Sequence, residues 1–384
     1  MSAAFAVLLG GTSALTPLLP RLSERLSMDP LFVSMLFVGY IIPLATLLLL
    51  LSRVQVARWA PLMLVSSMGI TAIADVLIAM VSPSGLMLGR FLYGIAGGAA
   101  TGSASMLVVA AIGSRGRAVT ATGSIIGAFV GVVSAQLLSA FAPWPPIELT
   151  FLGHAAISLL AGAGLLVILG LRRAANRGAL AGGPARSKIR SADTQYNLAA
   201  LASGSIAWIA LSGAYAYFPS AFGDLGMDVS KDFGVALMLV ASVTAQFLEP
   251  ALQRIAPWVS GTALVPSGIA LLLAGGITRS EVAAISGIIL TGFGVGIAYR
   301  LGLVAFTQGA AKGRQGAFVS FYTGVSYVVS AGLLFVGGLV GRLLSLVPAT
   351  ALFYGVVAVA ALCCYFVAPR IRDTQDDAEP LVEA

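Results

Sequence analysis

Twelve long apolar runs constrain the fold of this chain more than any other feature of its sequence. A helix needs about 20 mostly apolar residues to cross the hydrocarbon core of a bilayer, and each run meets that requirement. Only 10% of the residues are charged, against roughly 25% in an ordinary soluble domain. The sequence therefore predicts an all-α polytopic membrane protein. The predicted transmembrane helices cover residues 2–19, 30–52, 59–81, 84–111, 117–141, 147–171, 197–222, 232–253, 258–277, 281–309, 315–340 and 347–369.

The connection at 172–196 is longer and more polar than the others. It is rich in Gly, and its basic residues outnumber its single acid, Asp193. These properties predict a linker between two six-helix bundles, residues 1–171 and 197–369, followed by a disordered acidic tail at 370–384. We interpret the basic residues of the linker as a topology anchor rather than as a site for anionic lipid. They are Arg172, Arg173, Arg177, Arg186, Lys188 and Arg190.

Basic residues also predict how the chain is oriented in its membrane. The connections that follow the even-numbered runs hold 15 of the 22 Lys and Arg residues, counted with Arg117 at the edge of the fifth run and with the C-terminal tail. Cytoplasmic loops of membrane proteins carry such an excess of positive charge. Both termini are therefore predicted to be cytoplasmic, in a multi-pass protein of the inner membrane. This bias explains the net charge of +7, so we expect no nucleic-acid partner.

The two halves of the sequence resemble each other at an offset of about 200 residues. Pro20 matches Pro219 at an offset of 199, and Gly94 matches Gly294 at an offset of 200. An even number of runs in each half predicts parallel repeats, related by an axis along the membrane normal. Two such halves can rock about a central cavity and open it to each side of the membrane in turn. The repeat therefore favours a transporter.

The fourth run contains the segment Arg90-Phe-Leu-Tyr-Gly94, followed by further glycines up to Gly102. This segment, and the layout of six plus six runs joined by a basic loop, resemble the major facilitator superfamily along nearly the whole chain. The resemblance implies twelve transmembrane helices arranged as two six-helix parallel repeats around a central cavity. In many members of that family the arginine of this motif is linked to proton coupling.

Two segments depart from the patterns of this family. The loop after the second run keeps Arg53 and Arg58, but Val54 stands where the family has an acidic residue. The fifth run has glycine at every fourth position from Gly123 to Gly131, but Ala128 stands where proton-driven antiporters have a proline. Glycines at this spacing still allow two helices to approach closely.

Ionisable residues inside the runs are candidates for function, because each costs about 2.5–3.5 kcal/mol at the centre of a helix. Asp75 and Arg90 each lie about seven residues from the turn between the third and fourth runs, and so at equal depth. We expect them to pair, either permanently or through a carboxylate whose protonation frees the arginine. Glu249 and Arg300 also share a depth and are expected to pair, although Glu249 has Arg254 as an alternative partner.

His154 is the only histidine of the chain and lies near the outer end of the sixth run. Histidine titrates near neutral pH, so a role in proton transfer is one interpretation. The position of this run at the outside of the bundle favours the other interpretation, which is a hydrogen-bonded or interfacial histidine.

The resemblance implies that the first, fourth, seventh and tenth runs line the central cavity, with the second, fifth, eighth and eleventh at its flanks. Polar and aromatic side chains with few charges on these runs suit an amphipathic or aromatic organic substrate. Helix packing with a single hydrogen bond is the alternative for each of them. The candidate cavity residues are Ser13, Thr16, Tyr40, Gly94, Gly98, Gln136, Trp208, Tyr215, Gln246, Tyr299, Tyr322 and Tyr327.

Motifs that the sequence lacks argue against other classes of protein. It has no Gly-x-x-x-x-Gly-Lys-Ser/Thr segment, which argues against ATP-driven transport by this chain. It has no metal-ligand cluster and no nucleophile–base–acid set, so we expect no metal, no cofactor and no enzymatic activity. Cys363 and Cys364 are adjacent in an apolar run without ligand spacing, and we interpret them as packing residues.

These observations predict a secondary active transporter that moves a small organic molecule across the cytoplasmic membrane by alternating access, coupled to protons. Export is favoured over uptake, because the chain resembles bacterial efflux members and lacks sugar-porter motifs. One alternative is proton-linked uptake of an organic anion, contacted by Arg90 and Arg300. Another is a receptor or scaffold that keeps a transporter fold without transporting. The expected partners are the lipid bilayer, the substrate and protons, and we expect a monomer.

Overall fold

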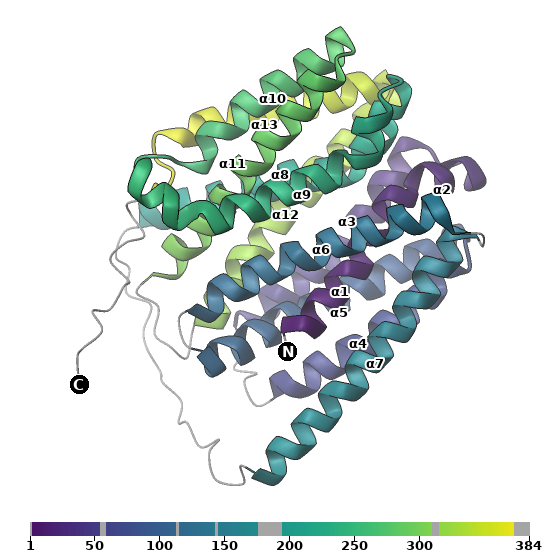
Figure 1. Cartoon of the computed structure of the whole chain (residues 1–384), viewed down its shortest axis with the longest axis vertical. Coiled ribbons are helices and arrows are strands. Elements are labelled where there is room, and N and C mark those ends of the chain that lie inside the picture. Colours follow the sequence, from purple (N-terminus) through teal and green to yellow (C-terminus); the bar gives the residue numbers. More distant parts are fainter. Residues whose placement is uncertain are drawn as a thin grey trace. The chain divides into compact units, whose positions relative to one another are not determined.

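A computed structural model describes residues 2–53, 59–112, 115–142, 145–175, 194–308 and 315–371. Over these residues the protein has twelve helices that are long and apolar enough to cross a membrane (Figure 1). The predicted all-α fold with twelve transmembrane helices is thereby confirmed. The predicted run 84–111, for example, corresponds to α5 (Pro83–Ile112), because length and apolar composition are properties that the sequence shows directly.

The chain forms two units. Unit 1 comprises Met1–Met28, Leu36–Ala192 and Ala310–Gly324, and unit 2 comprises Asp29–Met35, Asp193–Gly309 and Val325–Ala384. Most of the predicted linker at 172–196, and the predicted tail from residue 372 onward, lie outside the described residues. The elements of unit 1 are α1 (Ser2–Ala14), the 3-10 helix η1 (Thr16–Leu18), α2 (Leu19–Leu26), most of α3 (Pro30–Leu51), α4 (Ala60–Ala79), α5, α6 (Arg115–Phe141) and α7 (Pro146–Ala175).

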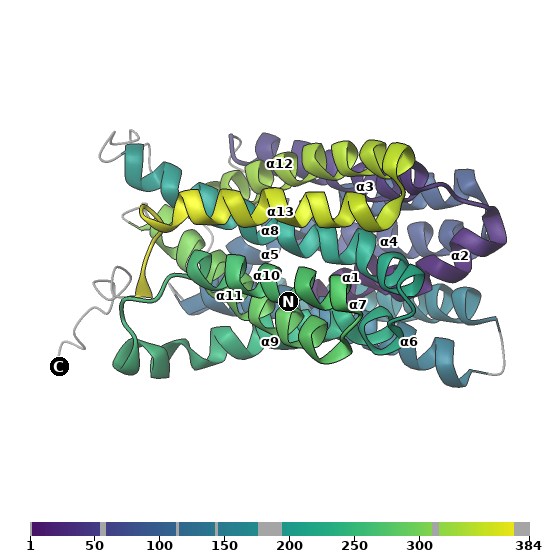
Figure 2. The same cartoon turned by 90° about the horizontal axis from the view of Figure 1, so that it is seen from above.

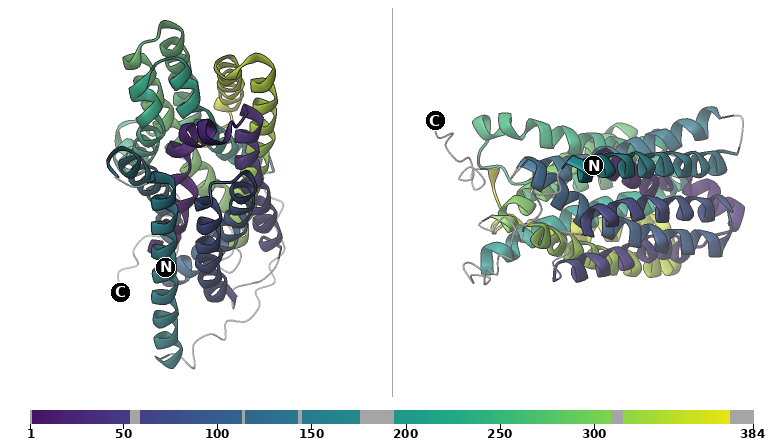
Figure 3. Two further views of the ribbon diagram at one scale, coloured as in Figure 1. Left: turned by 90° about the vertical axis from the view of Figure 1, so that its right-hand side faces the viewer. Right: turned by 90° about the horizontal axis from the view of Figure 1, so that it is seen from below.

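Unit 2 repeats this order of helices. In Figure 2, α10 and α11 lie side by side in this unit, as α4 and α5 do in unit 1. Figure 3 shows α7, the last helix of unit 1, as one long helix. The helices of unit 2 are α8 (Thr194–Asp224), α9 (Asp228–Ile255), α10 (Gly261–Thr278), α11 (Glu281–Thr307), most of α12 (Gln315–Leu344) and α13 (Leu346–Tyr365).

The first predicted helix, 2–19, is interrupted. α1 ends at Ala14, η1 follows, and α2 begins at Leu19. Pro17 and Pro20 stand at the first positions of these two short elements, where a helix does not need the N–H that proline lacks. The last carbonyls of α1 have no intrahelical partner at such a break, so donors from other helices can bind them.

Matching backbone turns show the internal repeat. Ser27 precedes α3 and Gly226 precedes α9 at an offset of 199, and both have a positive φ, 50° and 68°. Val81 and Arg279, which precede α5 and α11, have φ values of 47° and 53°. The repeat is therefore present in the backbone and not only in the spacing of a few residue types.

Contacts between helices correct the predicted offset for the central helices. A Cβ at Gly94 would meet the Tyr40 carbonyl of α3, and a Cβ at Gly292 would meet the Met238 carbonyl of α9. Gly94 and Gly292 are 198 residues apart, and so are Tyr40 and Met238. Gly94 therefore corresponds to Gly292 rather than to Gly294, because the turn before α11 is reached one residue earlier than the spacing of Pro20 and Pro219 predicts.

The turns give a test of backbone strain. A left-handed backbone costs a residue with a Cβ about 1–2 kcal/mol, and glycine does not pay this penalty. We expect Ser27→Gly, at an exposed turn residue, to raise the free energy of unfolding by about 1 kcal/mol. Gly226→Ala should lower it by a similar amount. Thermal unfolding of the purified protein measures both, and Gly355→Ala, at a helical glycine with nothing within 4 Å of the added Cβ, is the control.

Small residues set the spacing of α1 and α6. A Cβ at Gly131 would overlap the backbone of Gly10, and a Cβ at Gly127 would overlap the backbone of Ala6. The predicted role of these glycines, close approach of two helices, is what the structure shows. The third glycine of the series, Gly123, has nothing within 4 Å of its Cβ position and takes no part in this contact.

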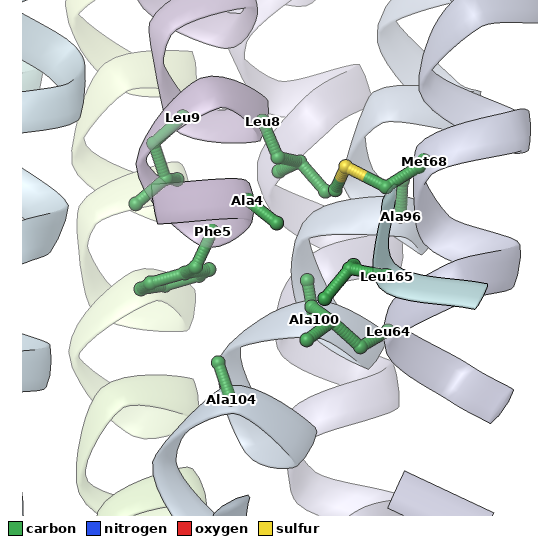
Figure 4. Packing of buried hydrophobic residues seen from close by; sticks show 10 residues of the cluster. All are labelled: Ala4, Phe5, Leu8, Leu9, Leu64, Met68, Ala96, Ala100, Ala104 and Leu165. Atoms are coloured by element: carbon green, nitrogen blue, oxygen red, sulfur yellow. The ribbon is translucent and has the colours of Figure 1, made fainter. Parts of the chain in front are cut away.

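Apolar side chains from four helices form the core of unit 1 beside these contacts (Figure 4). Alanines at every fourth position of α5 leave space, which larger side chains from α1, α4 and α7 fill. This packing fixes the rotation of α1, α4 and α7 about their axes, and so decides which of their polar residues meet. The members are Ala4, Phe5, Leu8, Leu9, Leu64, Met68, Ala96, Ala100, Ala104 and Leu165.

Candidate functional site

A buried polar cluster lies inside unit 1, one helical turn from this apolar core. Asp75 of α4 is fully buried, and Arg90 of α5 is 1% exposed. Tyr93 of α5 is also fully buried, and His154 of α7 is partly buried. Asp75 follows Leu64, Met68 and Thr71 on the buried stripe of α4, at the spacing that places residues on one face of a helix. Four ionisable side chains are therefore held in an apolar surrounding.

Asp75 is bound by two side chains. His154 Nδ1 lies 2.8 Å from Asp75 Oδ2, and the Tyr93 hydroxyl donates to Asp75 Oδ1. The other ring nitrogen of the histidine, Nε2, lies 2.8 Å from the carbonyl oxygen of Val7 in α1. The imidazole thus connects the carboxylate of α4 to the backbone of α1.

These partners determine how many protons the pair holds. A backbone carbonyl only accepts hydrogen bonds, so His154 Nε2 carries a hydrogen. The contact between Nδ1 and Asp75 then contains one proton, which sits either on the imidazole or on the carboxyl group. In both arrangements the Asp75–His154 pair has no net charge. Loss of this proton would leave one hydrogen for the two contacts of the ring, so one ring nitrogen would face an acceptor 2.8 Å away without a hydrogen between them.

Gly11 of α1 makes room for the cluster. A Cβ at this position would overlap the His154 ring and the Tyr93 hydroxyl. The glycine therefore allows the backbone of α1 to lie directly against the two side chains that hold Asp75. Any side chain here would push α1 away from α7 and break the contact between His154 and Val7.

Arg90 has different partners from the one predicted. Its Nη1 donates to the Thr12 carbonyl over 2.8 Å, and its Nε donates to the Leu36 carbonyl over 3.1 Å. The guanidinium also lies over the rings of Phe37 and Tyr40, at 5.2 and 4.5 Å from their centroids. Thr12 is in the last turn of α1, where a cation is favourable because the carbonyls of a helix end carry partial negative charge.

The predicted ion pair between Asp75 and Arg90 is therefore wrong for this structure. Both oxygens of Asp75 are already bound, by His154 and by Tyr93. Equal depth on two helices does not make two side chains meet, and Arg90 binds the carbonyls of Thr12 and Leu36 instead. The break in α1 supplies Arg90 with a carbonyl that the sequence pattern does not reveal.

Unit 2 brings together three of the predicted cavity residues. Trp208 of α8 packs against Tyr327 of α12 with ring centroids 4.4 Å apart, and edge-on against Tyr299 of α11 at 5.7 Å. The indole Nε1 of Trp208 is buried and has no hydrogen-bond partner among the described residues. We call Trp208, Tyr299 and Tyr327 the aromatic cluster.

Arg300 of α11 donates from Nη1 to the backbone carbonyl of Gln246 in α9. The side chain of Glu249, its predicted partner, lies outside the described residues. Arg58 of the predicted loop motif also lies outside them, and Arg53 is exposed. The predicted second ion pair and the loop motif therefore stay predictions.

The other predicted cavity residues fall into two groups. Gly94 and Gly98 pack against the backbone of α3, at Tyr40 and Leu44, so they contact protein and do not line a cavity. This corrects their predicted role, which the family motif suggested without giving the rotation of α5. The second group has polar or aromatic side chains. Ser13, Thr16 and Tyr322 are buried, and Gln136 and Tyr215 are half-buried.

The second repeat does not copy the cluster of the first. At the offset of 198, Leu273 corresponds to Asp75 and Ile288 corresponds to Arg90. α7 and α13 begin at Pro146 and Leu346, so Tyr354 corresponds to His154. The Tyr354 hydroxyl donates to the Ala210 carbonyl of α8 over 2.9 Å, just as His154 contacts the backbone of α1. The contact is common to both repeats, but only the first has a carboxylate beside it.

Sequence reasoning missed Tyr93 as a member of the cluster and did not identify the partner of His154. Tyr93 belongs to the segment Arg90-Phe-Leu-Tyr-Gly94, and its place one turn after Arg90 was a signal that it faces the same helices. His154 was interpreted as hydrogen-bonded or interfacial; it is hydrogen-bonded, but to Asp75, so that interpretation did not identify its partner. A lone histidine at the depth of a buried carboxylate was the signal that the sequence offered.

Comparisons with known proteins agree with this architecture. A crystal structure of a point mutant of the nucleoside transporter NupG matches with a TM-score of 0.65 and 12% sequence identity, over 95% of this chain and 99% of that chain. At this identity the likeness shows the fold alone. Comparison with curated proteins by sequence gave no match. The family model of the Major Facilitator Superfamily matches residues 1–333, most of the chain, and the chain therefore belongs to the major facilitator superfamily.

Proposed function

We propose that this protein is a proton-coupled secondary transporter that exports a small organic molecule across the cytoplasmic membrane by alternating access. The observation that carries the proposal is the Asp75–His154 pair, which holds one proton in a buried site. Ionisable groups inside a membrane domain are costly and mark proton or substrate pathways. We further propose that both termini are cytoplasmic, as the distribution of basic residues predicts.

The pair links its proton to the arrangement of three helices. Loss of the proton leaves the imidazole one hydrogen for two acceptors, so His154 must give up its contact either with Asp75 or with the Val7 carbonyl. His154 also holds the carbonyl of Val7, and Gly11 leaves no room for a side chain between α1 and the ring. Loss of either contact therefore changes how α1, α4 and α7 are held together. A proton that binds one arrangement better than another shifts the population between them, which is the requirement for coupling.

The aromatic cluster supports a substrate with a planar ring. Trp208, Tyr299 and Tyr327 come from three helices of unit 2, and the indole N–H has no partner among the described residues. A ring that bears a hydrogen-bond acceptor would stack on these side chains and accept from the indole. One matching solved structure is that of a nucleoside transporter, so nucleosides belong among the compounds to be tested.

The contacts of Arg90 weigh against uptake of an organic anion through this residue. Its guanidinium is bound by two carbonyls and two aromatic rings, and it is 1% exposed. An anionic substrate would have to displace these partners. A neutral aromatic substrate needs no such exchange, which favours it over a carboxylate.

Proton flux in liposomes tests the proposal. Purified protein is reconstituted with a pH dye inside, and uridine, adenosine, benzoate and tetraphenylphosphonium are added outside one at a time. Exchange of the compound for protons should make the lumen more alkaline, which supports export, whereas entry together with protons should acidify it, which supports uptake. Empty liposomes are the control. Protection against thermal unfolding by a compound that causes no pH change would instead support a receptor or a uniporter.

A further inference from the structure

Two buried hydroxyl groups near the cluster have no hydrogen-bond partner among the described residues. They belong to Thr71 of α4 and Ser158 of α7, which are both fully buried. Other hydroxyls of the same helices bind a carbonyl of their own helix, as Ser67 does to Met63 over 2.7 Å. An unsatisfied buried hydroxyl costs about 1–3 kcal/mol, so these two residues call for an explanation.

The two hydroxyls lie on the helices that carry the proton pair. Thr71 is four residues before Asp75, and Ser158 is four residues after His154, which is one helical turn in each case. The two helices are antiparallel. Asp75 of α4 contacts His154 of α7, whereas a Cβ at Gly162, later in α7, would lie 3.1 Å from Met68, earlier in α4. Thr71 and Ser158 therefore share one level, between the Asp75–His154 contact and the Met68–Gly162 contact.

The hydroxyls of Thr71 and Ser158 can supply the hydrogen-bond donors that the Asp75–His154 pair lacks after it loses its proton. While the pair holds its proton, every polar atom of Asp75 and His154 has a hydrogen-bond partner, and the pair does not need the two hydroxyls as donors. Once the proton is lost, the pair has a surplus of acceptors. Each hydroxyl is a donor without an acceptor and lies one helical turn from the pair, where Cβ atoms are about 5–6 Å apart. A gap of this size is too long for a direct hydrogen bond and suits one bridging water molecule.

We propose that Thr71 and Ser158 are positioning residues for proton release, which donate hydrogen bonds to the Asp75–His154 pair through one water molecule after the pair has lost its proton. This inference rests on the proposed function for its meaning in transport. In the proton-bound state the hydroxyls stay unpaired, so the protein retains them at a cost in stability.

Few charged groups surround the pair besides its own members. Tyr93 of α5 donates to Asp75, and Arg90 of the same helix binds the carbonyls of Thr12 and Leu36 and lies over the ring of Tyr40 in α3. The described residues of α1 hold no ionisable side chain. On α7, Glu148 lies six residues before His154 and is held by Arg25 of α2. A change in pH dependence after replacement of Thr71 or Ser158 can therefore be assigned to the pair.

Thermal unfolding between pH 5 and pH 9 tests the inference without a substrate. We expect the parent to show a break in its unfolding temperature that Asp75→Asn removes, because the break reports the proton of the pair. Thr71→Val and Ser158→Ala should move this break upward by about one pH unit, since the deprotonated pair loses a donor. Below the break, both variants should unfold at the same temperature as the parent or at a higher one.

Matched variants serve as controls. Ser67→Ala in α4 and Thr150→Val in α7 remove hydroxyls that bind their own helix, so the break should stay in place. Thr71→Ser retains the donor and should behave as the parent does. The inference is overturned by a parent without an Asp75-dependent break, by an unmoved break in Thr71→Val and Ser158→Ala, or by unfolding temperatures lowered at every pH. Substrate flux that does not respond to a proton gradient would overturn the proposed function but not this inference.

Discussion

Replacement of Asp75 by asparagine is expected to abolish proton-driven flux while substrate exchange continues. Asparagine has the shape of a protonated aspartic acid: its oxygen accepts from Tyr93, and its amide donates to Nδ1 of His154. The variant therefore keeps the proton-bound arrangement of the cluster and has no proton to release. In liposomes the pH signal should fall to that of empty vesicles, while exchange of labelled for unlabelled substrate should retain the rate of the parent.

Glu148→Gln is the control for this result. Glu148 is a carboxylate of the same unit, but its partner Arg25 is 55% exposed, and the pair lies outside the cluster. This variant should keep both the pH signal and substrate exchange. Proton-driven flux of normal size in Asp75→Asn would remove Asp75 from the mechanism, and the Asp75–His154 pair would then be a structural contact only.

Gly131→Ala is expected to destabilise the protein by about 3 kcal/mol or to prevent its folding. The added Cβ would overlap the backbone of Gly10, and a backbone cannot escape by changing a rotamer as a side chain does. α1 would have to move away from α6. Because α1 also carries the carbonyls of Val7 and Thr12, the contacts of His154 and Arg90 would be lost with it. The yield of folded protein and its unfolding temperature measure the effect.

Gly123→Ala tests whether the glycines of α6 act through the close contact with α1 or through their spacing in the sequence. Gly123, Gly127 and Gly131 form one series with the same spacing, but nothing lies within 4 Å of a Cβ at Gly123. This variant should fold as well as the parent, because alanine favours a helix over glycine. Equal damage from Gly123→Ala and Gly131→Ala would mean that the close approach of α1 and α6 is not what the glycines provide.

The helices could be predicted from the sequence because their signal is local. An apolar run long enough to cross a bilayer must satisfy its own backbone, and a helix does so. The predicted run 258–277 corresponds to α10 (Gly261–Thr278) for this reason. Pro17 and Pro20 indicate that the first helix is kinked or ended near them, because proline disrupts a helix interior. The sequence stays apolar through the break, so it does not show that α1 ends at Ala14.

The contacts of the site could be predicted only in part. Depth along a helix follows from counting residues, and this is the basis of the prediction that Asp75 and Arg90 lie at the same level. The rotation of each helix about its axis depends on packing against other helices, which counting residues does not measure. For that reason the partners of Asp75 turned out to be His154 and Tyr93, and Gly94 turned out to contact α3.

The absence of a carboxylate at position 273, which corresponds to Asp75 in the second repeat, has a consequence for the energetics of transport. Under the proposed function, a cycle in which the Asp75–His154 pair is the proton carrier moves one proton. For an uncharged substrate such a cycle is electrogenic, because one net charge crosses the membrane. The membrane potential then adds about 2.3 kcal/mol per 100 mV to the pH gradient as a driving force. Substrate accumulation in vesicles would therefore respond to a potassium diffusion potential even when the two sides have equal pH.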